Sequence, residues 1–224
     1  MRSGRALAAA VLPEPMRAIG WQARASGWFT KPVTAGFLGV ATVGVATKHA
    51  RPGTAHITLY IGIRDEGTER VVAELCGLTD GYRQCTAVTS IGYLLPGRCW
   101  REWWITPGNA GHVAGELAAA VRGYVEPYLV TLSSDRAELL AGVHHSAGFG
   151  QAVGGCRAAV LLARHRGRDQ ADEFLRQRIA ELGTRTDAAA EQERAMAAGV
   201  REWLTGPAGD PAARYHPGGS DESG

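Results

Sequence analysis

The hydrophobic positions of this chain recur with two different periods, and the change of period separates a strand-rich part from a helix-rich part. Between about residues 28 and 106, apolar and polar residues alternate in short runs divided by turn residues, which is typical of an antiparallel sheet. After Thr106, apolar residues recur every third or fourth position, which is typical of amphipathic helices. This segregation predicts an α+β fold rather than an alternating arrangement of strands and helices.

The clearest strand signal lies in residues 55–63. One face of this run carries four aliphatic side chains: Ile57, Leu59, Ile61 and Ile63. Residues 37–47 are small or apolar on both faces, which is typical of an interior strand. The turn residues of Arg51–Thr54 lie between the two runs and predict that they pair as a hairpin.

Three further runs are expected to complete the sheet. Residues 85–95 end at Pro96-Gly97 and residues 100–106 follow directly, so these two runs are expected to form a second hairpin. Residues 28–31 are expected to add an edge strand. The sequence therefore predicts a mainly antiparallel sheet of four to five strands in the N-terminal half.

Helices are expected both before and after the strands of this sheet along the chain. An N-terminal helix, broken around Pro13 and Pro15, precedes it, and Asn109 is a candidate cap for the first of several helices that follow. That helix is expected to end near Gly123 and Pro127, and Ser133 or Ser134 to cap the next. The later helices are expected at residues 152–165, 168–182 and, after a cap at Asp187, 187–204. The domain prediction is a single α+β domain at 1–182 (sheet 28–106, helices 110–182), an additional C-terminal helix at 187–204 and a disordered tail at 205–224.

Composition excludes a wholly disordered, collagen-like or coiled-coil protein. A hydrophobic fraction of 45% and a charged fraction of 21% are typical of a globular protein, and the net charge of +2 does not by itself indicate a nucleic-acid or membrane partner. Lys31 and Lys48 are the only lysines among 24 basic residues, a bias that a GC-rich genome explains. The many arginines of the helical pair at 152–182 are therefore weak evidence for nucleic-acid binding. Acidic residues also interleave with these arginines, so nucleic-acid binding is disfavoured but stays an alternative.

The cysteine spacing and the length of the apolar stretches indicate which cofactors and which cellular compartment to expect. Cys76, Cys85, Cys99 and Cys156 form no C-x-x-C pair and match no zinc or redox spacing, so reduced thiols and no metal or other cofactor are expected. No stretch approaches the roughly 20 apolar residues of a membrane span, and the apolar N-terminal run stops at Pro13. We therefore expect a cytoplasmic protein without a membrane partner.

Aromatic residues are concentrated in the sheet half and supply the main functional signal. In the run 100–106, alternation places Trp100 and Trp104 on one face and Trp103 on the other, so at least one tryptophan faces away from the core. Either helices cover both faces of the sheet or an aromatic surface remains exposed. The leading hypothesis is a non-enzymatic protein-binding module whose binding surface is formed by five residues: Tyr60, Trp100, Arg101, Trp103 and Trp104.

An enzyme with a dispersed site is the alternative that the sequence leaves open. His112 and Glu116 lie four residues apart on one helix face, but two ligands do not make a metal site. His144 and His145 are the other groups that such a site would use. The glycine-rich run 148–155 lacks the register and the lysine of a phosphate-binding loop, and no catalytic residue is predicted.

The chain resembles, over residues 5–182, a bacterial family described only as a domain of unknown function. The resemblance rests on a pattern of aromatic and glycine residues: Gly20-Trp21, Trp28-Phe29, Ile91–Leu95, Trp100 and Trp103-Trp104. It implies a leading helix, an antiparallel sheet and C-terminal helices. The chain departs from the pattern at Pro13 and Pro15 and in the helix 187–204. The resemblance implies no catalytic residues, and the sequence does not determine the oligomeric state.

Overall fold

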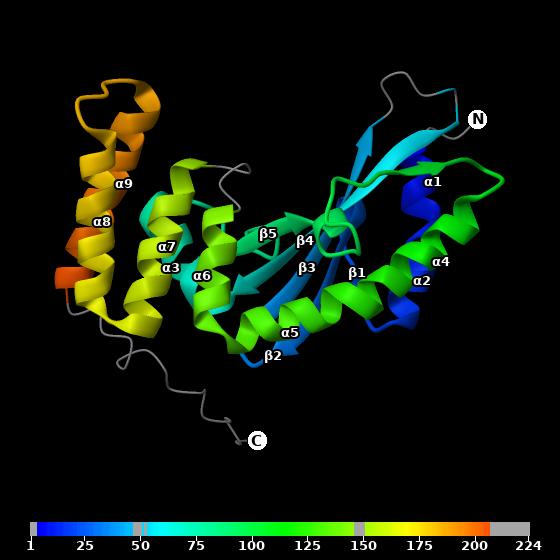
Figure 1. Cartoon of the computed structure of the whole chain (residues 1–224), viewed down its shortest axis with the longest axis horizontal. Coiled ribbons are helices and arrows are strands. Elements are labelled where there is room, and N and C mark those ends of the chain that lie inside the picture. The colour runs from blue at the N-terminus through cyan, green and yellow to red at the C-terminus, as the bar shows by residue number, and fades with distance from the viewer. Residues whose placement is uncertain (1–3, 47–50, 52, 146–150, 207–224) are drawn as a thin grey trace, which may run out of the picture. The chain divides into compact units, whose positions relative to one another are not determined.

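An antiparallel sheet forms the N-terminal half of the computed structural model, which describes residues 4–46, 51, 53–145 and 151–206 (Figure 1). The α+β class is therefore as predicted. Among these residues the sheet has six strands in the order β1-β2-β3-β4-β5, with β6 also pairing with β4. The strands are β1 (Gln22–Ala23), β2 (Trp28–Thr34), β3 (Phe37–Ala46), β4 (Ala55–Asp65), β5 (Ala87–Ser90) and β6 (Trp103–Ile105).

The hairpin of β3 and β4 is the centre of the sheet and confirms the strongest strand prediction. Its register runs without a break from Phe37 opposite Asp65 to Ala46 opposite His56. The aliphatic face of β4 is buried as the alternation predicts, since Ile57, Leu59, Ile61 and Ile63 are all at most 2% exposed. This face is the core side of the sheet.

The predicted second hairpin is wrong. Strands β5 and β6 both pair with β4, at Tyr60–Ile63 and at Ala55–Ile57 respectively, and not with each other. The turn at Pro96-Gly97 does form, because Arg98 N–H donates to the Leu95 carbonyl at 3.0 Å. However, this turn belongs to a long connection that starts with the 3₁₀ turn η2 (Ile91–Tyr93), and the eleven-residue β4 is long enough to pair with both short strands along one edge.

The region assigned to strands contains a helix that the periodicity did not reveal. Helix α3 (Glu66–Cys76) starts directly after β4. Asp65 caps it, with its Oδ1 accepting from the backbone N–H groups of Gly67 at 3.1 Å and Thr68 at 3.2 Å. An aspartate followed by glutamates at positions 66 and 69 is a helix-start signal, and it was outweighed by the strand pattern on either side.

The remaining helices of the N-terminal part cover the core face of the sheet. The expected break of the first helix is confirmed, since α1 (Gly4–Val11) and α2 (Pro13–Ala18) meet at Leu12. Contacts of α1 with β3 and β4, and of α5 with β2 and β4, place these helices over the core side, where Figure 1 shows α4 and α5 running beside the sheet. The helices after the sheet are α4 (Ala110–Ala120), the π-helix η3 (Val121–Val125), α5 (Glu126–Ser134) and α6 (Arg136–His145).

The expected end of the first of these helices is wrong. The chain does not leave the helix near Gly123 and Pro127 but continues through the π-helix η3 into α5. Pro127 lies in the first turn of α5, and the wide π turn before it lets a residue without an N–H group follow without ending the helix. The cap of α6 is Asp135, which accepts from the Ala137 N–H at 2.9 Å, and not Ser133 or Ser134.

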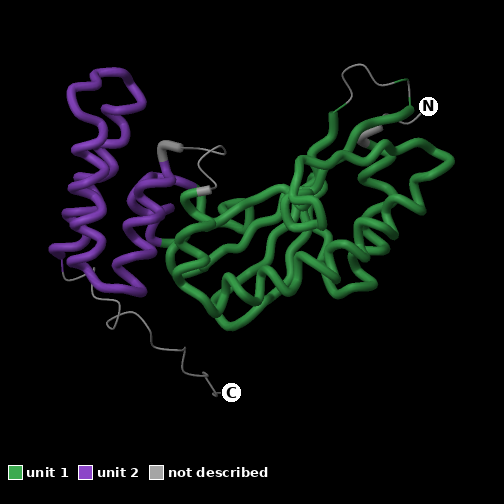
Figure 2. Tube along the Cα trace, viewed as in Figure 1, with its two compact units in different colours: residues 1–70, 79–149 green, residues 71–78, 150–224 purple. Residues whose placement is uncertain are grey.

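The chain separates into two compact units (Figure 2). The first contains residues 1–70 and 79–149, and the second contains residues 71–78 and 150–224. Helices α7 (Gln151–Arg166), α8 (Arg168–Leu182) and α9 (Ala188–Thr205) pack on one another in the second unit and match the predicted helices. Residues 150–182, which the sequence analysis places in the sheet domain, thus pack with the last helix.

Some predicted features fall where the structure gives no description. The predicted tail lies outside the described residues from position 207 on, and so do residues 148–150 of the glycine-rich run. Among the residues that are described, no helix is both long enough and apolar enough to cross a bilayer.

A half-buried polar contact joins the end of α2 and strand β2 to α5. Lys31 Nζ donates to Glu126 Oε1 at 2.7 Å and to the Ile19 carbonyl at 2.8 Å. The indole Nε1 of Trp21, a residue only 1% exposed, donates to the same Glu126 oxygen at 3.1 Å. One carboxylate at the start of α5 therefore satisfies both a strand lysine and a buried tryptophan.

Replacing Glu126 with alanine is expected to lower the free energy of unfolding by about 1–3 kcal/mol, because a buried indole N–H loses its acceptor. Urea denaturation followed by circular dichroism measures the change. Glu116→Ala is the matched control, since Glu116 lies on the exposed side of α4, and its effect should stay within about 0.5 kcal/mol. Equal effects of the two substitutions would contradict this role of Glu126.

The cap of α9 predicts a pH-dependent contribution to stability. The ion pair with Arg185, followed by the Ala190 N–H, lowers the pKa of Asp187. A lowered folded-state pKa means that the stabilisation is present above the ordinary aspartate pKa of about 3.9 and is lost as pH falls through the folded-state value. Asparagine keeps the capping oxygen but loses the charge. The stability difference between wild type and Asp187→Asn should therefore be largest near neutral pH and disappear in acid.

Urea unfolding at a series of pH values from neutral to strongly acidic measures this difference. Asp187→Ala is the companion variant, because it removes the cap as well as the charge. It should remain less stable than Asp187→Asn in acid. A difference between wild type and Asp187→Asn that does not change with pH would show that the ion pair adds nothing to folding.

Candidate functional site

Aromatic side chains gather on the face of the sheet opposite the core. Trp28, Thr42 and Tyr60 are direct partners across β2, β3 and β4, so they share one face, and Trp28 and Tyr60 lie about 10 Å apart. His56 and Trp104 are likewise direct partners across β4 and β6. His56 lies four residues before Tyr60, which is about 13 Å along the same face.

The rings on this face form three contacting pairs. The ring centroids are 6.2 Å apart for Trp28 and Tyr82, and the two planes are inclined by 70°. They are 6.1 Å apart for Tyr60 and Trp100, inclined by 55°. His56 and Trp104 form the closest pair, at 4.5 Å and 74°. The Trp28–Tyr82 and His56–Trp104 contacts are edge to face, a favourable geometry for aromatic rings, whereas the Tyr60–Trp100 contact is tilted.

Two arginines complete the first of these pairs. The Arg83 guanidinium lies 5.9 Å from the Trp28 ring and 5.8 Å from the Tyr82 ring, and that of Arg24 lies 5.9 Å from the Tyr82 ring. In the described part of the chain, neither arginine forms a salt bridge with a carboxylate. We use the name aromatic surface for these six rings and two cations: Trp28, His56, Tyr60, Tyr82, Trp100, Trp104, Arg24 and Arg83.

The structure brings together three of the five binding residues that the sequence predicted. Trp100 and Trp104 are 47% and 38% exposed, and Tyr60 is half-buried between β3 and the Trp100 ring. Trp103 is instead 7% exposed, because it pairs with Ile57 and faces the core. The Arg101 guanidinium lies over the Trp103 ring at 5.1 Å. Trp103 therefore belongs to the core and not to the exposed surface.

Five residues of the aromatic surface were missed by the sequence analysis: Trp28, His56, Tyr82, Arg24 and Arg83. Two of them had a usable signal, because Trp28 and His56 lie on predicted strands at positions that alternate with core residues. Tyr82 and Arg83 lie in the loop between α3 and β5, and no periodic pattern places a loop residue on a sheet face.

Close backbone approaches hold the Trp100 segment over the sheet. A Cβ atom at Gly92 would lie 2.3 Å from the Cys99 carbonyl oxygen, so only glycine fits there. Thr58 Oγ1, on the outer face of β4, donates to the Arg101 carbonyl at 3.1 Å. A Cβ atom at Gly44 would lie 2.7 Å from the Tyr60 ring, so this ring rests directly on the backbone of β3.

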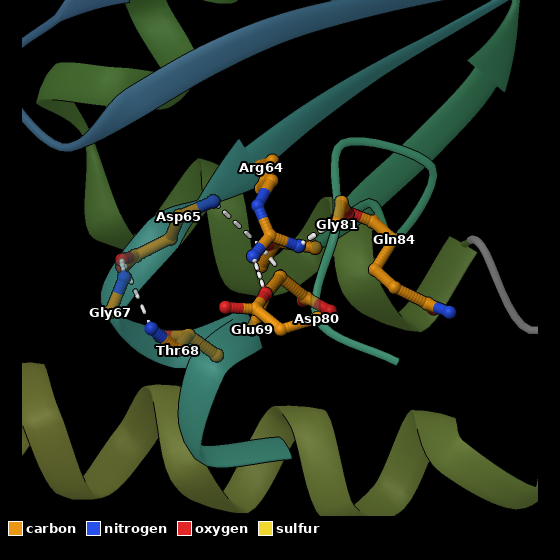
Figure 3. Close-up of polar contacts among 9 residues, drawn as sticks. Arg64, Asp65, Gly67, Thr68, Glu69, Asp80, Gly81 and Gln84 are labelled. Carbon is orange, nitrogen blue, oxygen red and sulfur yellow. Dashed lines mark hydrogen bonds and ion pairs between the residues drawn. The ribbon is translucent and has the colours of Figure 1, made fainter. Parts of the chain in front are cut away.

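Arg64 holds the loop that carries Tyr82 and Arg83 (Figure 3). Its guanidinium donates to the Gly81 carbonyl at 2.9 Å and to the Gln84 carbonyl at 3.1 Å, and it forms an ion pair with Asp80. Arg64 is itself only 5% exposed. A buried cation on β4 thus fixes both ends of the turn from which Tyr82 reaches Trp28.

A second set of hydrogen bonds beside Arg64 joins β4, α3 and the start of β5. Thr86 Oγ1 accepts from the Asp65 backbone N–H at 2.8 Å and donates to Glu69 Oε1 at 2.9 Å. All three residues are buried. These contacts, together with the Asp65 cap of α3, give each of these polar groups a partner and stabilise the end of the loop.

The described side chains of the enzyme alternative are exposed and are divided between two helices, α4 and α6. His112 and Glu116 face each other across 3.9 Å on α4, and the His112 side chain is 77% exposed. His144 is an exposed residue of α6, and the side chain of His145 lies outside the described residues. Among the residues that the structure describes, no three histidine, cysteine or acidic side chains come together as metal ligands.

A largely apolar cavity of about 570 Å³ opens between α1 and strands β1–β3. Eleven residues line it: Ala8, Ala9, Leu12, Pro13, Ala23, Arg24, Ser26, Gly27, Phe29, Val43 and Val45. Arg24 is the one ionisable side chain among these described residues, and His112, Glu116 and His144 are not part of the lining. The cavity therefore does not place an acid and a base opposite each other, as general acid–base chemistry needs.

Several arginines of the second unit are paired with carboxylates. Arg176 contacts Asp172 at 3.0 Å and Glu173 at 2.8 Å, and Arg178 contacts Glu193 at 2.6 Å. The hydrogen bond from Arg176 is the main reason that the pKa of Asp172 is lowered. These arginines of the helical pair are thus largely neutralised, as a solvated helix face would be.

Arg64→Gln is expected to lower the free energy of unfolding by about 1–3 kcal/mol, because the Gly81 and Gln84 carbonyls lose a charged donor. It should also speed trypsin cleavage after Arg83, since the loop is no longer held to β4. Urea denaturation and mass spectrometry of the tryptic fragments measure the two effects. Arg176→Gln, an exposed helix residue, is the control and should change neither by more than experimental error. Unchanged cleavage in Arg64→Gln would show that other contacts hold the loop.

Comparisons with known proteins add no second source of information about this surface. No family model, no curated protein and no solved structure matches the chain. The resemblance to the bacterial family of unknown function therefore stays a prediction. Among the described residues, exposed rings and arginines without a carboxylate partner lie on the sheet face opposite helices α1 and α5.

Proposed function

We propose that this protein is a non-enzymatic, cytoplasmic binding module whose aromatic surface binds an acidic, partly apolar segment of a partner protein. The observation that carries the proposal is the aromatic surface itself. Its rings lie on the sheet face opposite the core, and the helices that contact the sheet cover the core face. The exposure of Trp100 and Trp104 is explained by a partner that covers them.

The residue types favour a protein partner. Tryptophan, tyrosine and arginine are the side chains that contribute most to binding free energy at protein interfaces. Here they are held in fixed positions by ring contacts and by the Arg64 and Thr58 hydrogen bonds. A surface that is already ordered loses little side-chain entropy when a partner binds.

The charge beside Trp28 and Tyr82 favours acidic residues in the partner, whereas at the other end of the surface the Glu102 carboxylate lies 3.5 Å from His56. Arg24 and Arg83 place two cations beside Trp28 and Tyr82, and no carboxylate of the described chain forms a salt bridge with either. A partner carboxylate would find there a charged donor together with an apolar ring surface.

Ring geometry makes single-stranded nucleic acid a weaker candidate for the partner. A base stacks on a free, flat ring face. The pairs Trp28–Tyr82 and His56–Trp104 instead meet edge to face, and the Arg83 guanidinium lies over the Trp28 ring. The rings therefore offer edges and apolar contact more than open stacking platforms.

A peptide library displayed on phage, selected against the full chain, tests the proposal. Selected peptides should combine acidic and apolar residues. Fluorescently labelled synthetic copies of them should bind the protein, as measured by a rise in their fluorescence anisotropy. Trp100→Ala and Trp104→Ala are each expected to weaken binding at least tenfold, which corresponds to about 1.4 kcal/mol. Tyr124→Ala is the matched control, because this tyrosine is 44% exposed in the helical segment η3 and not on the sheet.

Two outcomes would overturn the proposal. Selected peptides that bind wild type and the Trp100→Ala and Trp104→Ala variants equally would show that the aromatic surface is not the docking site. A labelled single-stranded oligothymidine that binds wild type, loses affinity in the same variants and weakens steeply with salt would identify the surface as a nucleic-acid site instead.

A further inference from the structure

Three sulfur atoms from three helices lie together in the second unit. Cys76, the last residue of α3, places its Sγ 3.5 Å from Cys156 Sγ on α7 and 3.8 Å from Met196 Sδ on α9. All three residues belong to the same compact unit. We call this group the sulfur cluster.

The sulfur cluster combines burial with access. Cys156 is 3% exposed and belongs to the packed core between the helices. Cys76 and Met196 are half-buried, so one side of the cluster is in contact with solvent. An ion can therefore reach the cluster from the Cys76 and Met196 side, while Cys156 closes it from the core.

We propose that the sulfur cluster binds a Cu(I) ion through the Cys76 and Cys156 thiolates and the Met196 thioether. Metal–sulfur bonds in proteins are about 2.3 Å long, which separates sulfur ligands by about 4 Å in a trigonal plane. The two distances from Cys76 Sγ, 3.5 Å to Cys156 Sγ and 3.8 Å to Met196 Sδ, lie within about half an ångström of that separation. Small side-chain rotations are enough to admit the ion.

The ligand set selects this ion over other metals. Thiolate and thioether sulfur are soft donors and favour Cu(I), whereas Ca²⁺, Mg²⁺ and Mn²⁺ require oxygen ligands. Structural zinc sites use four ligands from cysteine, histidine and carboxylates. In the described residues no third side chain of those types joins the two cysteines, and the third donor is a methionine.

The binding step balances in protons and charge. The two thiols each release one proton to solvent as Cu(I) binds, and the thioether binds without a proton change, so the occupied site carries one negative charge. No electron is transferred, because copper enters and stays as Cu(I). The metal would join the end of α3 to α7 and α9, so it should also stabilise the second unit.

The other two cysteines provide controls in the same chain. Cys99 is exposed, and Cys85 packs against Gly62 in the sheet. Both belong to the first unit and not to the sulfur cluster. Cys99→Ser should therefore leave specific copper binding unchanged.

The test is a competition titration of the full, reduced chain with Cu(I) and the chelator bathocuproine disulfonate under argon. We expect one high-affinity Cu(I) per chain and two protons released. Cys76→Ser should lower the affinity at least a hundredfold, and Met196→Leu, which conserves volume, at least tenfold. Copper X-ray absorption should give three sulfur neighbours in wild type and two in Met196→Leu. Circular dichroism checks that each variant folds.

Three results would overturn the proposal. The first is a Cu(I) affinity that is the same in Cys76→Ser as in Cys99→Ser, which would place copper outside the cluster. The second is full affinity in Met196→Leu, which would remove the thioether from the site. If Cu(I) does not bind and peptide mapping finds Cys76 joined to Cys156 after peroxide treatment, the pair is a thiol–disulfide couple and not a metal site.

Discussion

Strand β4 constrains the rest of the sheet, because an extended strand must send alternate side chains to opposite faces. Its eleven residues pair with β3 along one edge and with both β5 and β6 along the other. The aliphatic residues from Ile57 to Ile63 supply the core, so His56, Thr58 and Tyr60 have to face the other way. The core and the aromatic surface are thus two consequences of one alternation.

Polar contacts from the same strand convert this face into a fixed surface. Arg64 binds the carbonyls of the loop that carries Tyr82, and Thr58 binds the carbonyl of the residue after Trp100. Each contact satisfies a buried polar group on β4 and at the same time fixes an aromatic ring above the sheet. A surface built in this way can present its rings to a partner without first having to order them.

The two proposals concern different units and depend on different physics. The aromatic surface on the first unit recognises a partner through ring area and unpaired positive charge, whereas the sulfur cluster lies within the second unit and depends on soft ligand chemistry. The paired arginines of α8 belong to neither, because nearby carboxylates already bind them. The proposed metal site and the proposed partner surface are thus formed by separate sets of residues.

Local patterns in the sequence determined the α+β class, the β3–β4 hairpin, the break at Pro13 and helices α7 to α9, since each depends on side-chain period or on a cap such as Asp187. The pairing of β5 and β6, the helix α3 and the continuation past Pro127 depended on contacts between distant segments. Alternation showed that Trp103 and Trp104 face opposite ways, but only the pairing with Ile57 decided which one is buried. The same holds for Cys76, Cys156 and Met196, because no sequence spacing brings three distant sulfur atoms together and only tertiary packing does so.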